Sequence, residues 1–332
     1  MQREVDENRI PGAVVLIKKG NQIICKAAYG FAQKYDFDNR LLKIPEKLTT
    51  EHLFDIASLT KVVGTTTAMM LLLDQGYIEI DDPVGKYIKA FNAPDKQKIT
   101  IRHLLTHTSG LYEWYPMYYR ASNKQEVYGL IGELPLKYPV GDERHYSDLG
   151  FTILGQAIET VSGLPLDKYM AEKIFVPLAM EHTLFNPLLN GNFKNIAATS
   201  HGNPFEKRMV HDPSLGFVFK EIDPNQWNGW RNYTLKGEVN DGNAWYANGG
   251  ISGAAGLFST ADDLQKLLDM LIENGKIGDD QFISEKTLNL FLSADSFKNG
   301  LGWMMDAENS FMKNGPVGNI SAIQALQGQA SQ

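Results

Sequence analysis

The chain has 332 residues, of which 43% are hydrophobic and 21% are charged, and these proportions are typical of a soluble globular protein. Its length allows one composite domain or two domains with a large core. The formal net charge of −7 leaves no basic footprint, so we expect no nucleic-acid partner. The single cysteine, Cys25, excludes an internal disulfide and a cysteine-based zinc site, and we expect it to be a buried small apolar residue.

The chain begins with a charged segment, residues 1–9, which we expect to be the latter part of an amphipathic helix. This segment lacks the apolar stretch of a signal peptide. No later run is long enough to span a membrane, so we expect no membrane span in this chain. We expect the beginning of this helix to precede residue 1, so the sequence does not determine the native compartment. It does not determine the oligomeric state either.

Residues 13–24 are rich in β-branched side chains, with Gly20 and Asn21 among them. This pattern predicts two strands joined by a tight Gly20–Asn21 turn. The result is a β-hairpin, which residues 28–32 extend. A polar segment then leads to the most apolar part of the chain.

A helix is predicted from Ser58 to the stop signal Gly76, with Met69 to Leu73 at its centre. Because its side chains are apolar on nearly every face, we expect it to be buried in the middle of the fold. Two polar side chains, Ser58 and Lys61, lie at its beginning and share one face, since they are three residues apart. Ser58 also lies at the positive end of the helix dipole.

Ser58 and Lys61 have the spacing of an activated nucleophile. Burial disfavours the charged form of a lysine, so we expect Lys61 to be a neutral amine near neutral pH that takes the proton of the Ser58 hydroxyl. The alternative is an ordinary helix N-cap at Ser58, followed one turn later by a solvent-facing lysine. The spacing also arises by chance: Ser310 and Lys313 repeat it, but turn formers flank that pair and no buried helix surrounds it.

Residues 99–110 are predicted to form a helix that Thr100 caps and Gly110 ends. His103 and His107 would share one face of this helix, which is a zinc-binding spacing. No Glu or Asp accompanies them within the segment. We therefore interpret both histidines as structural.

Tyr146, Ser147 and Asp148 precede an apolar-faced helix predicted over residues 149–163. Side chains at a helix entrance can point into a cleft, so these three residues are candidates for a site. Residues 205–246 are polar, punctuated by Pro and Gly, and carry many aromatic side chains. This stretch is either a long loop held by its aromatic side chains or a substrate-binding wall.

Residues 248–259 are rich in glycine and alanine, which suits close backbone packing. Ser252 is not the serine of a nucleophile elbow, because Ala254 stands where the second glycine is required. Thr260 then caps a helix that is predicted to reach Gly275.

Several separated motifs agree in their order with one family. They are the Ser58–Lys61 pair in a buried helix, the Tyr146–Ser147 pair at a helix entrance, and the segments 104–111 and 253–260. With them the chain resembles the serine β-lactamase-like superfamily, and most closely its branch of class C β-lactamases, DD-peptidases and related carboxylesterases. The resemblance covers most of residues 10–305. It implies an α+β fold, an α/β sandwich of the β-lactamase/transpeptidase type, in which helices flank an antiparallel sheet and a largely helical region is inserted.

This fold implies a sheet domain of residues 1–65 and 248–332, and a mainly helical region of residues 66–247 with the aromatic-rich loop. The third motif of the family, His or Lys followed by Thr or Ser and Gly on a core strand, is missing. The tail from Ile320 lacks turn signals, and the expected C-terminal strands are absent from it. Since a shifted reading frame permits a His-Thr-Gly motif here, we expect this tail to be out of frame, which the gene sequence decides.

The resemblance also implies roles for individual residues. Ser58 is the acylated nucleophile, Lys61 its hydrogen-bonded partner, and Tyr146 the base that relays protons to the leaving group and later activates water. The Ser58 N–H would supply half of an oxyanion hole. Ser147 and Asp148 would contact the substrate. Asp148 departs from the family, in which asparagine is common at this position. An ionised carboxylate only accepts hydrogen bonds, so it offers the substrate no amide donor.

We therefore expect a bacterial serine hydrolase that forms an acyl-enzyme on Ser58 and acts on an ester or on a D-amino-acid peptide or amide, as an esterase or a DD-peptidase does. The substrate is expected to be a small molecule or a peptidoglycan-type compound, with no cofactor and no metal. One alternative is a class C-type β-lactamase, which Asp148 disfavours. Another is a non-enzymatic penicillin-binding sensor or scaffold. Family members are often found in the cell envelope.

Overall fold

The computed structural model describes residues 1–191 and 193–305. Strand β1 (Gly12–Lys19) pairs antiparallel with β2 (Gln22–Tyr35), and Gly20 in the turn between them has a φ of +55°. Strand β3 (Leu41–Lys47) pairs with the far end of β2 and completes a three-stranded antiparallel sheet. The predicted hairpin is confirmed.

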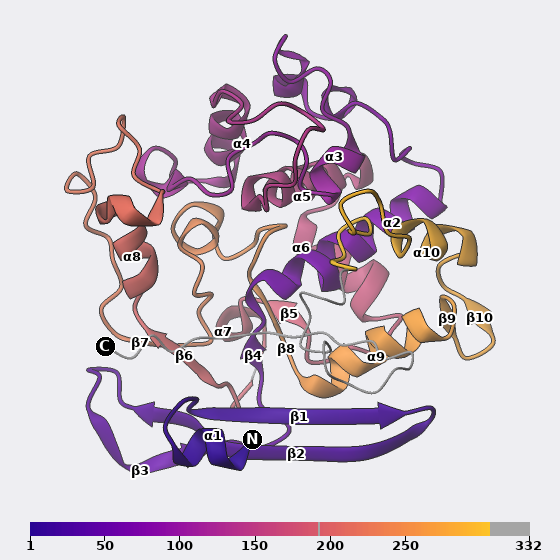
Figure 1. Cartoon of the computed structure of the whole chain (residues 1–332). Helices are drawn as coiled ribbons and strands as arrows, with labels where there is room; N and C mark the ends of the chain where they lie inside the picture. Colours follow the sequence, from indigo (N-terminus) through magenta and orange to yellow (C-terminus); the bar gives the residue numbers. More distant parts are fainter. Residues whose placement is uncertain (192, 306–332) are drawn as a thin grey trace.

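Helices lie on both sides of this sheet, α9 (Ala261–Ile272) against β1 and the short α1 (Gln2–Asp6) against β2 (Figure 1). An ion pair between Lys18 and Asp269, at 2.6 Å, joins the hairpin to α9. A late segment of the chain therefore returns to cover its first strands.

The prediction that Cys25 is buried is wrong, because the residue is only half-buried. It lies on β2 close to the turn, where its neighbours Ile23 and Ile24 are exposed as well. The side chains of β2 are more buried at the end away from the turn.

The central helix changes its winding along its length. It begins with the 3₁₀ turn η1 (Ala57–Leu59), continues through the π-helical η2 (Lys61–Thr66) and ends as the α-helix α2 (Thr67–Asp74). All residues from Val63 to Leu72 are buried. The prediction of a buried helix is therefore confirmed.

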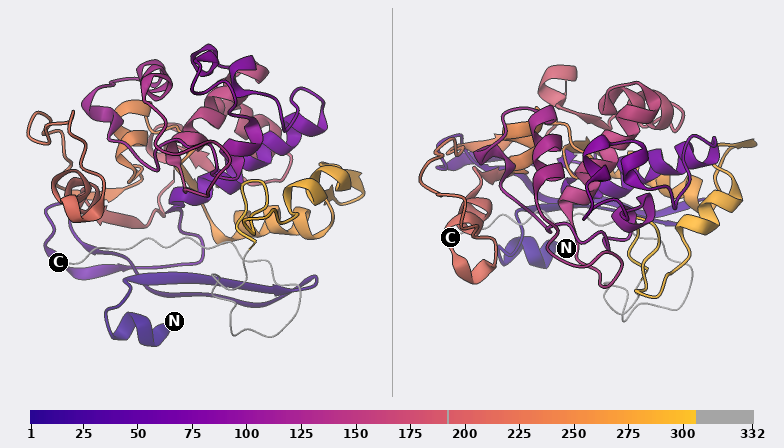
Figure 2. Two further views of the ribbon diagram at one scale, coloured as in Figure 1. Left: turned by 45° about the horizontal axis from the view of Figure 1, so that its top comes forward. Right: turned by 90° about the horizontal axis from the view of Figure 1, so that it is seen from above.

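Further helices pack around the central helix on the side away from the hairpin (Figures 1 and 2). Together they form the main hydrophobic core with it. The helix predicted after Asp148 is confirmed, with Ser147 as its N-cap and Gly163 in a left-handed conformation at its end. The helices of this region are α3 (Ile101–Leu105), α4 (Lys124–Glu133), α5 (Asp148–Ser162), α6 (Leu166–Met170) and the π-helical η6 (Ala171–Phe175).

The helix predicted to end at Gly110 is shorter in the structure. Thr100 caps it as expected, but it ends before His107, whose φ is +60°. His103 Nδ1 accepts a hydrogen bond from the Thr100 N–H at 3.1 Å, whereas His107 Nδ1 accepts one from the Ser147 N–H at 2.9 Å. The two histidines therefore do not share a helix face, and each has a structural partner.

A second antiparallel sheet has the order β4 (Phe54–Asp55), β8 (Leu257–Ser259), β5 (Leu184–Phe185). Strand β4 leads directly into the turn that carries Ser58. The segment before β8 packs against α5 so closely that a Cβ atom on Gly253 would lie 2.2 Å from a backbone carbonyl oxygen of that helix. This confirms the close backbone packing that the glycine-rich segment predicts.

The aromatic-rich stretch contains short elements of its own. Its aromatic side chains pack against the helical region and against one another: the Trp227 ring is centred 4.6 Å from the Tyr118 ring and 4.8 Å from the Trp230 ring. These contacts hold the stretch in place, as the first of the two alternatives requires. The elements of the stretch are α8 (Pro204–His211), η7 (Pro213–Leu215), β7 (Thr234–Lys236) and η8 (Asn243–Ala247). Strand β7 pairs with β6 (Ala198–His201), which precedes the stretch.

Thr260 caps α9 as predicted, since its side chain accepts a hydrogen bond from the Asp263 N–H at 3.3 Å. The remaining elements are η3 (Val84–Lys86), η4 (Lys89–Asn92), η5 (Met117–Tyr119), α7 (Pro187–Asn190), β9 (Lys276–Ile277), β10 (Asp280–Gln281) and α10 (Glu285–Phe291).

Two predictions concern residues outside the described part of the chain, namely the Ser310–Lys313 pair and the tail from Ile320. The division into residues 1–65 with 248–332, and residues 66–247, also stays a prediction. Among the residues that the structure describes, no helix combines the length and the apolar character needed to cross a membrane.

Candidate active site

Ser58 is exposed at the start of the central helix. The residue before it, Ala57, has a φ of +46°, a left-handed conformation that costs a non-glycine residue on the order of 1–3 kcal/mol. The buried carboxylate of Asp55 holds this bend, because it accepts the Ala57 N–H at 2.9 Å and the Asn240 N–H at 2.7 Å. The bend presents Ser58 at the surface while the next turn enters the core.

Lys61 is buried, with only 4% of its surface exposed. Its Nζ lies 3.0 Å from Ser58 Oγ, 2.9 Å from the carbonyl oxygen of Ala254 and 2.6 Å from Asp148 Oδ1. The contacts with Ser58 and Ala254 are hydrogen bonds, and the contact with Asp148 is an ion pair. Lys61 thus faces inward, unlike the solvent-facing lysine of the N-cap alternative.

The expectation of a neutral Lys61 is wrong. Burial alone lowers the pKa of a lysine, but the charge of Asp148 and the contact with Tyr146 outweigh burial and raise the pKa of Lys61 well above its ordinary value. Lys61 is therefore an ammonium at neutral pH, paired with Asp148. It supplies a fixed positive charge and a hydrogen-bond donor beside the Ser58 hydroxyl, and another group must accept the serine proton.

Tyr146 lies beside this ammonium at the entrance of α5. The centre of its ring is 5.0 Å from Lys61 Nζ and 4.5 Å from the centre of the His107 ring. Tyr146 is 41% exposed, so water and substrate can reach it. A proton acceptor must carry its negative charge before the transfer, and an ammonium beside the ring stabilises that charge.

His107 supports Tyr146 from the protein side. Burial, followed by the charges of Lys61 and Arg144, lowers the pKa of His107 well below its ordinary value, so its ring is neutral at neutral pH. Because His107 Nδ1 accepts the Ser147 N–H, the ring is fixed between the helix entrance and the Tyr146 ring. Sequence reasoning gave His107 a structural role, and these contacts specify what it holds.

The two predicted substrate-binding residues have different surroundings. Ser147 is buried, donates its hydroxyl hydrogen to the carbonyl oxygen of Tyr112 at 2.7 Å and accepts the Gly150 N–H at 3.1 Å. These bonds use its hydroxyl as the cap of α5. Asp148 instead reaches Lys61 and is partly exposed. The structure thus brings four of the five predicted residues together and places Ser147 behind them.

Sequence reasoning missed two acidic residues near the site, Asp241 and Glu206. Burial, then the charge of Asp148, raises the pKa of Asp241 to about 6. Burial, then the charge of Asp241, raises the pKa of Glu206 to about 8. At neutral pH Asp241 is therefore mostly ionised and Glu206 mostly protonated. Both lie in the polar, aromatic-rich stretch, where no motif marks them.

A metal site does not accompany these groups in the part of the chain that the structure describes, because no three His, Cys, Asp or Glu side chains there are arranged to hold an ion. What the arrangement offers is an exposed hydroxyl, a buried ammonium in contact with it, and a phenol beside that ammonium. These are the parts of a nucleophilic serine site.

Known proteins share the sequence and the fold. The sequence pattern of the family described as Beta-lactamase matches residues 1–323. A protein of Escherichia coli K12, provisionally named D-alanyl-D-alanine carboxypeptidase, is 36% identical over an alignment of 313 residues, and the match covers 89% of this chain and 68% of that protein. The N-acetylmuramyl-L-alanine amidase of Bacillus subtilis 168 is 34% identical over an alignment of 316 residues, and the match covers 90% of this chain and 68% of that protein.

Among solved structures, the octameric penicillin-binding protein homologue from Pyrococcus abyssi superposes with a TM-score of 0.66 at 22% identity, covering 90% of this chain and 62% of that one. This confirms the expected α+β, β-lactamase/transpeptidase-like fold. The family and the relatives show that the chain is a serine hydrolase, which excludes the alternative of a non-enzymatic sensor or scaffold. Because the family pattern spans nearly the whole sequence, the chain belongs to the beta-lactamase family.

Proposed function

We propose that this serine hydrolase forms an acyl-enzyme on Ser58 from an ester or from a D-amino-acid peptide or amide. The 3.0 Å contact between Ser58 Oγ and the buried ammonium of Lys61 carries the proposal. The name of the Escherichia coli relative supports a D-amino-acid peptide, and a peptidoglycan-type compound is one substrate of this kind.

In the proposed reaction the Ser58 oxygen attacks the carbonyl carbon of the substrate while its proton passes to the phenolate of Tyr146. Lys61 stays an ammonium and stabilises the negative charge that moves from the phenolate towards the substrate. The bond from the carbonyl carbon to the leaving oxygen or nitrogen then breaks, and Tyr146 returns the proton to that atom. Water next attacks the acyl-enzyme, gives its proton to Tyr146, and Ser58 recovers a proton as the acid departs.

Asp148 argues against β-lactam turnover as the main activity. Its carboxylate is held by the Lys61 ammonium and offers the substrate no amide donor, because an ionised carboxylate only accepts hydrogen bonds. A side-chain amide at this position would have both a donor and an acceptor.

A fluorophosphonate probe tests the proposal. We expect it to label the peptide that contains Ser58, and to lose that labelling in Ser58→Ala but not in Ser293→Ala, which changes an exposed serine. Hydrolysis of p-nitrophenyl butyrate, a D-Ala-D-Ala peptide and nitrocefin then ranks the acyl donors. Labelling that survives in Ser58→Ala would sink the assignment, and labelling at Ser310 would transfer it.

A further inference from the structure

A buried arginine holds the chain segment that meets the Asp55 carboxylate. Arg231 is only 7% exposed, and a guanidinium keeps its positive charge in proteins. Its Cζ lies 4.7 Å from the centre of the Trp245 ring and 5.4 Å from the centre of the Tyr246 ring. Burying an arginine is costly unless its charge and its N–H groups find partners.

The N–H groups of Arg231 hold three consecutive residues of the chain. Nη2 donates to the carbonyl oxygens of Val239, at 2.8 Å, and Asn240, at 3.1 Å. Nη1 donates to the Glu238 carboxylate at 3.3 Å, while Nε donates to Asn203 Oδ1 at 3.2 Å. A planar guanidinium can make all of these bonds at once, whereas the single ammonium of a lysine cannot.

Asn240 connects Arg231 to the bend before the nucleophile. The Asn240 N–H donates to Asp55 Oδ2 at 2.7 Å, and the Ala57 N–H donates to Asp55 Oδ1 at 2.9 Å. Ala57 has the left-handed φ of +46° and directly precedes Ser58. A continuous series of hydrogen bonds therefore runs from the guanidinium through Asn240 and Asp55 to the residue before the nucleophile.

Arg231 also supplies a positive charge near the Asp55 carboxylate. Asp55 is 1% exposed and belongs to no ion pair among residues 1–191 and 193–305. Burial raises the pKa of the Asp55 carboxyl, whereas its two backbone N–H partners and then the charge of Arg231 act to lower it. Arg231 therefore stabilises the ionised form, in which Asp55 accepts both hydrogen bonds.

Two further acidic residues interact with the charge of Arg231. Glu238 forms an ion pair with it at 3.3 Å and also accepts the Tyr233 hydroxyl at 2.8 Å. The charge of Arg231 acts on Glu206 as well, but burial outweighs it and raises the pKa of Glu206 to about 8. Glu206 is therefore mostly protonated at neutral pH, which leaves Asp55 and Glu238 as the carboxylates that Arg231 stabilises.

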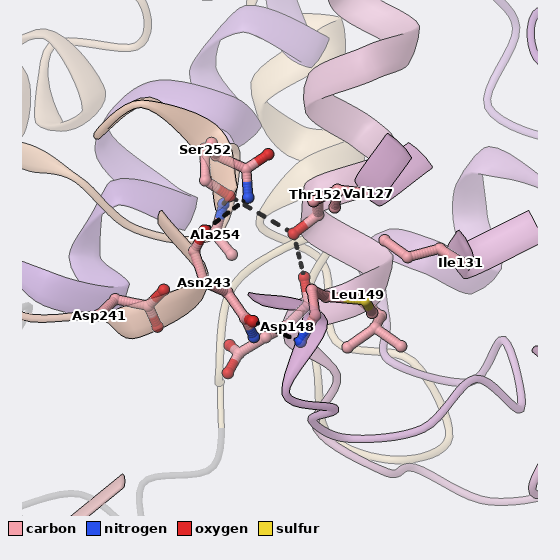
Figure 3. A pocket seen from close by; sticks show the side chains of 11 residues that line it. Val127, Ile131, Asp148, Leu149, Thr152, Asp241, Asn243, Ser252 and Ala254 are labelled. Atoms are coloured by element: carbon pink, nitrogen blue, oxygen red, sulfur yellow. Dashed lines mark hydrogen bonds between the residues drawn. The ribbon is translucent and has the colours of Figure 1, made fainter. Parts of the chain in front are cut away.

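The segment held by Arg231 also carries Asp241, which directly follows Asn240. The charges of Asp241 and Asp55 repel each other, so Asp241 opposes the effect of Arg231 on Asp55. Figure 3 shows Asp241 and Asp148 in the wall of one small pocket, and Asp148 is the ion-pair partner of Lys61. A displaced segment would therefore disturb the surroundings of both Asp55 and Asp148.

We propose that Arg231 is a positioning residue for the nucleophile. It holds the backbone of Val239 and Asn240 so that Asp55 keeps its charge and both N–H partners, and the bend before Ser58 keeps its shape. A left-handed alanine persists only where its surroundings hold it. Arg231 itself touches no reacting atom, and the inference rests on the acyl-enzyme proposed for Ser58.

Two substitutions separate the charge of Arg231 from its planar group. Arg231→Gln removes the charge and most of the N–H groups, whereas Arg231→Lys keeps the charge alone. The measurement is the second-order rate constant with which the fluorophosphonate labels Ser58, expressed per folded molecule. We expect a fall of about tenfold or more in Arg231→Gln, the factor that one hydrogen bond to a charged group supplies. Arg208→Gln, at an exposed arginine, should label at the wild-type rate.

The pH dependence of labelling distinguishes positioning from a contribution to stability alone. Protonation of Asp55 removes one acceptor from the bend, so labelling should slow at low pH. Without the charge of Arg231 the carboxyl takes up its proton at a higher pH. Between about pH 4 and about pH 8 we therefore expect the acid limb of Arg231→Gln to lie about one pH unit above that of the wild type. Arg231→Lys should keep the wild-type limb, although its labelling is slower at every pH.

Glu238→Gln serves if the Arg231 variants do not fold. The glutamine keeps an acceptor for Nη1 and removes a negative charge, so the acid limb should move to a lower pH. Wild-type labelling in Arg231→Gln, an acid limb that does not move in that variant, or an unmoved limb in Glu238→Gln would overturn the inference. If the probe still labels Ser58 of the wild type in those cases, the proposed acyl-enzyme stands without Arg231. Absence of labelling at Ser58 in the wild type would remove the proposed function itself.

Discussion

Asp148 Oδ1 lies 2.6 Å from Lys61 Nζ, and this contact fixes the charge of the lysine beside the nucleophile. Lys61 comes from the buried start of the central helix, whereas Asp148 is the first residue of α5. The pair therefore also joins two elements of the core. Because Asp148 holds Lys61 as an ammonium, proton transfer falls to Tyr146.

We expect Asp148→Asn to lower the pKa of Lys61, since it removes the negative charge that raises this pKa. An enzyme that needs the ammonium should then lose activity on p-nitrophenyl butyrate at a lower pH than the wild type does. Profiles of kcat/KM from about pH 6 to about pH 10 measure the shift of this alkaline limb. The exposed Asp142→Asn serves as the control. An alkaline limb that stays in place would contradict the assigned role of the pair.

Tyr146→Phe should slow the enzyme without loosening the fold. The change removes the proposed proton acceptor but keeps the ring that packs against His107. Loss of a positioned base typically costs about a hundredfold or more in rate. We expect kcat/KM for p-nitrophenyl butyrate to fall by that amount while the thermal midpoint stays near that of the wild type. Tyr77→Phe, at a residue 61% exposed, is the matched control. Near-normal turnover in Tyr146→Phe would refute the role.

Asp55→Asn tests the bend before the nucleophile. Asp55 accepts two backbone N–H groups, from Ala57 and from Asn240, with its two oxygens. An asparagine keeps one acceptor oxygen, so one buried N–H loses its partner at a cost of roughly 1–3 kcal/mol. We expect lower stability in urea and slower labelling of Ser58 by the fluorophosphonate. Because Asp55 positions Ser58 without contacting substrate, the loss should appear in kcat more than in KM. Unchanged labelling would show that the bend does not depend on this carboxylate.

Gly253→Ala should destabilise the protein by roughly 1–3 kcal/mol or more. The added Cβ would lie 2.2 Å from the Phe151 carbonyl oxygen and 3.0 Å from the Gly155 nitrogen, and both are backbone atoms of α5. Moving the chain away would also withdraw the neighbouring Ala254 carbonyl from Lys61. Gly129→Ala is the control, because a Cβ there meets nothing within 4 Å and α4 should gain roughly 0.5–1 kcal/mol. Urea unfolding compares the two, and equal stabilities would contradict the packing argument.

Glu206→Gln should change how stability depends on pH. Burial and the charge of Asp241 raise the pKa of Glu206 from 4.5 to about 8, so between these values the folded state holds a proton that the unfolded state releases. The free energy of unfolding therefore falls as pH rises, by up to about 1.4 kcal/mol for each pH unit. Glutamine removes this dependence and can still accept the Gly242 N–H that Glu206 accepts at 2.8 Å.

Relative to the wild type, Glu206→Gln should therefore become progressively more stable in urea between about pH 5 and about pH 8. The exposed Glu51→Gln should show no such trend. A difference between Glu206→Gln and the wild type that stays constant with pH would contradict a protonated Glu206.

Sequence patterns predicted the elements that depend on residues close together in the chain. The Gly20 turn, the apolar run after Ser58 and the Ser147 cap of α5 each depend on neighbouring residues, and each is present in the structure. The helix through residues 99–110 was predicted too long, because nothing in the sequence shows that His107 turns away to accept the Ser147 N–H.

The charge of Lys61 could not be predicted in the same way. Burial was visible in the apolar run around it, and burial alone gives a neutral amine. The contacts that reverse this come from Asp148 and Tyr146, far along the chain, and only the fold brings them to Nζ. Asp241 was missed for a similar reason, since an acidic residue in a polar stretch carries no sign that it will line a pocket.

The burial of Lys61 has a consequence for immobilising the enzyme on a surface. Reagents that couple proteins to a surface through lysine react with amines that are both exposed and unprotonated, and Lys61 is neither, with 4% of its surface exposed and its ammonium paired to Asp148. Ser58, one turn away, is open to solvent. The enzyme should therefore tolerate attachment through its outer lysines with its nucleophile still free, and a covalent serine inhibitor can count the working sites after immobilisation.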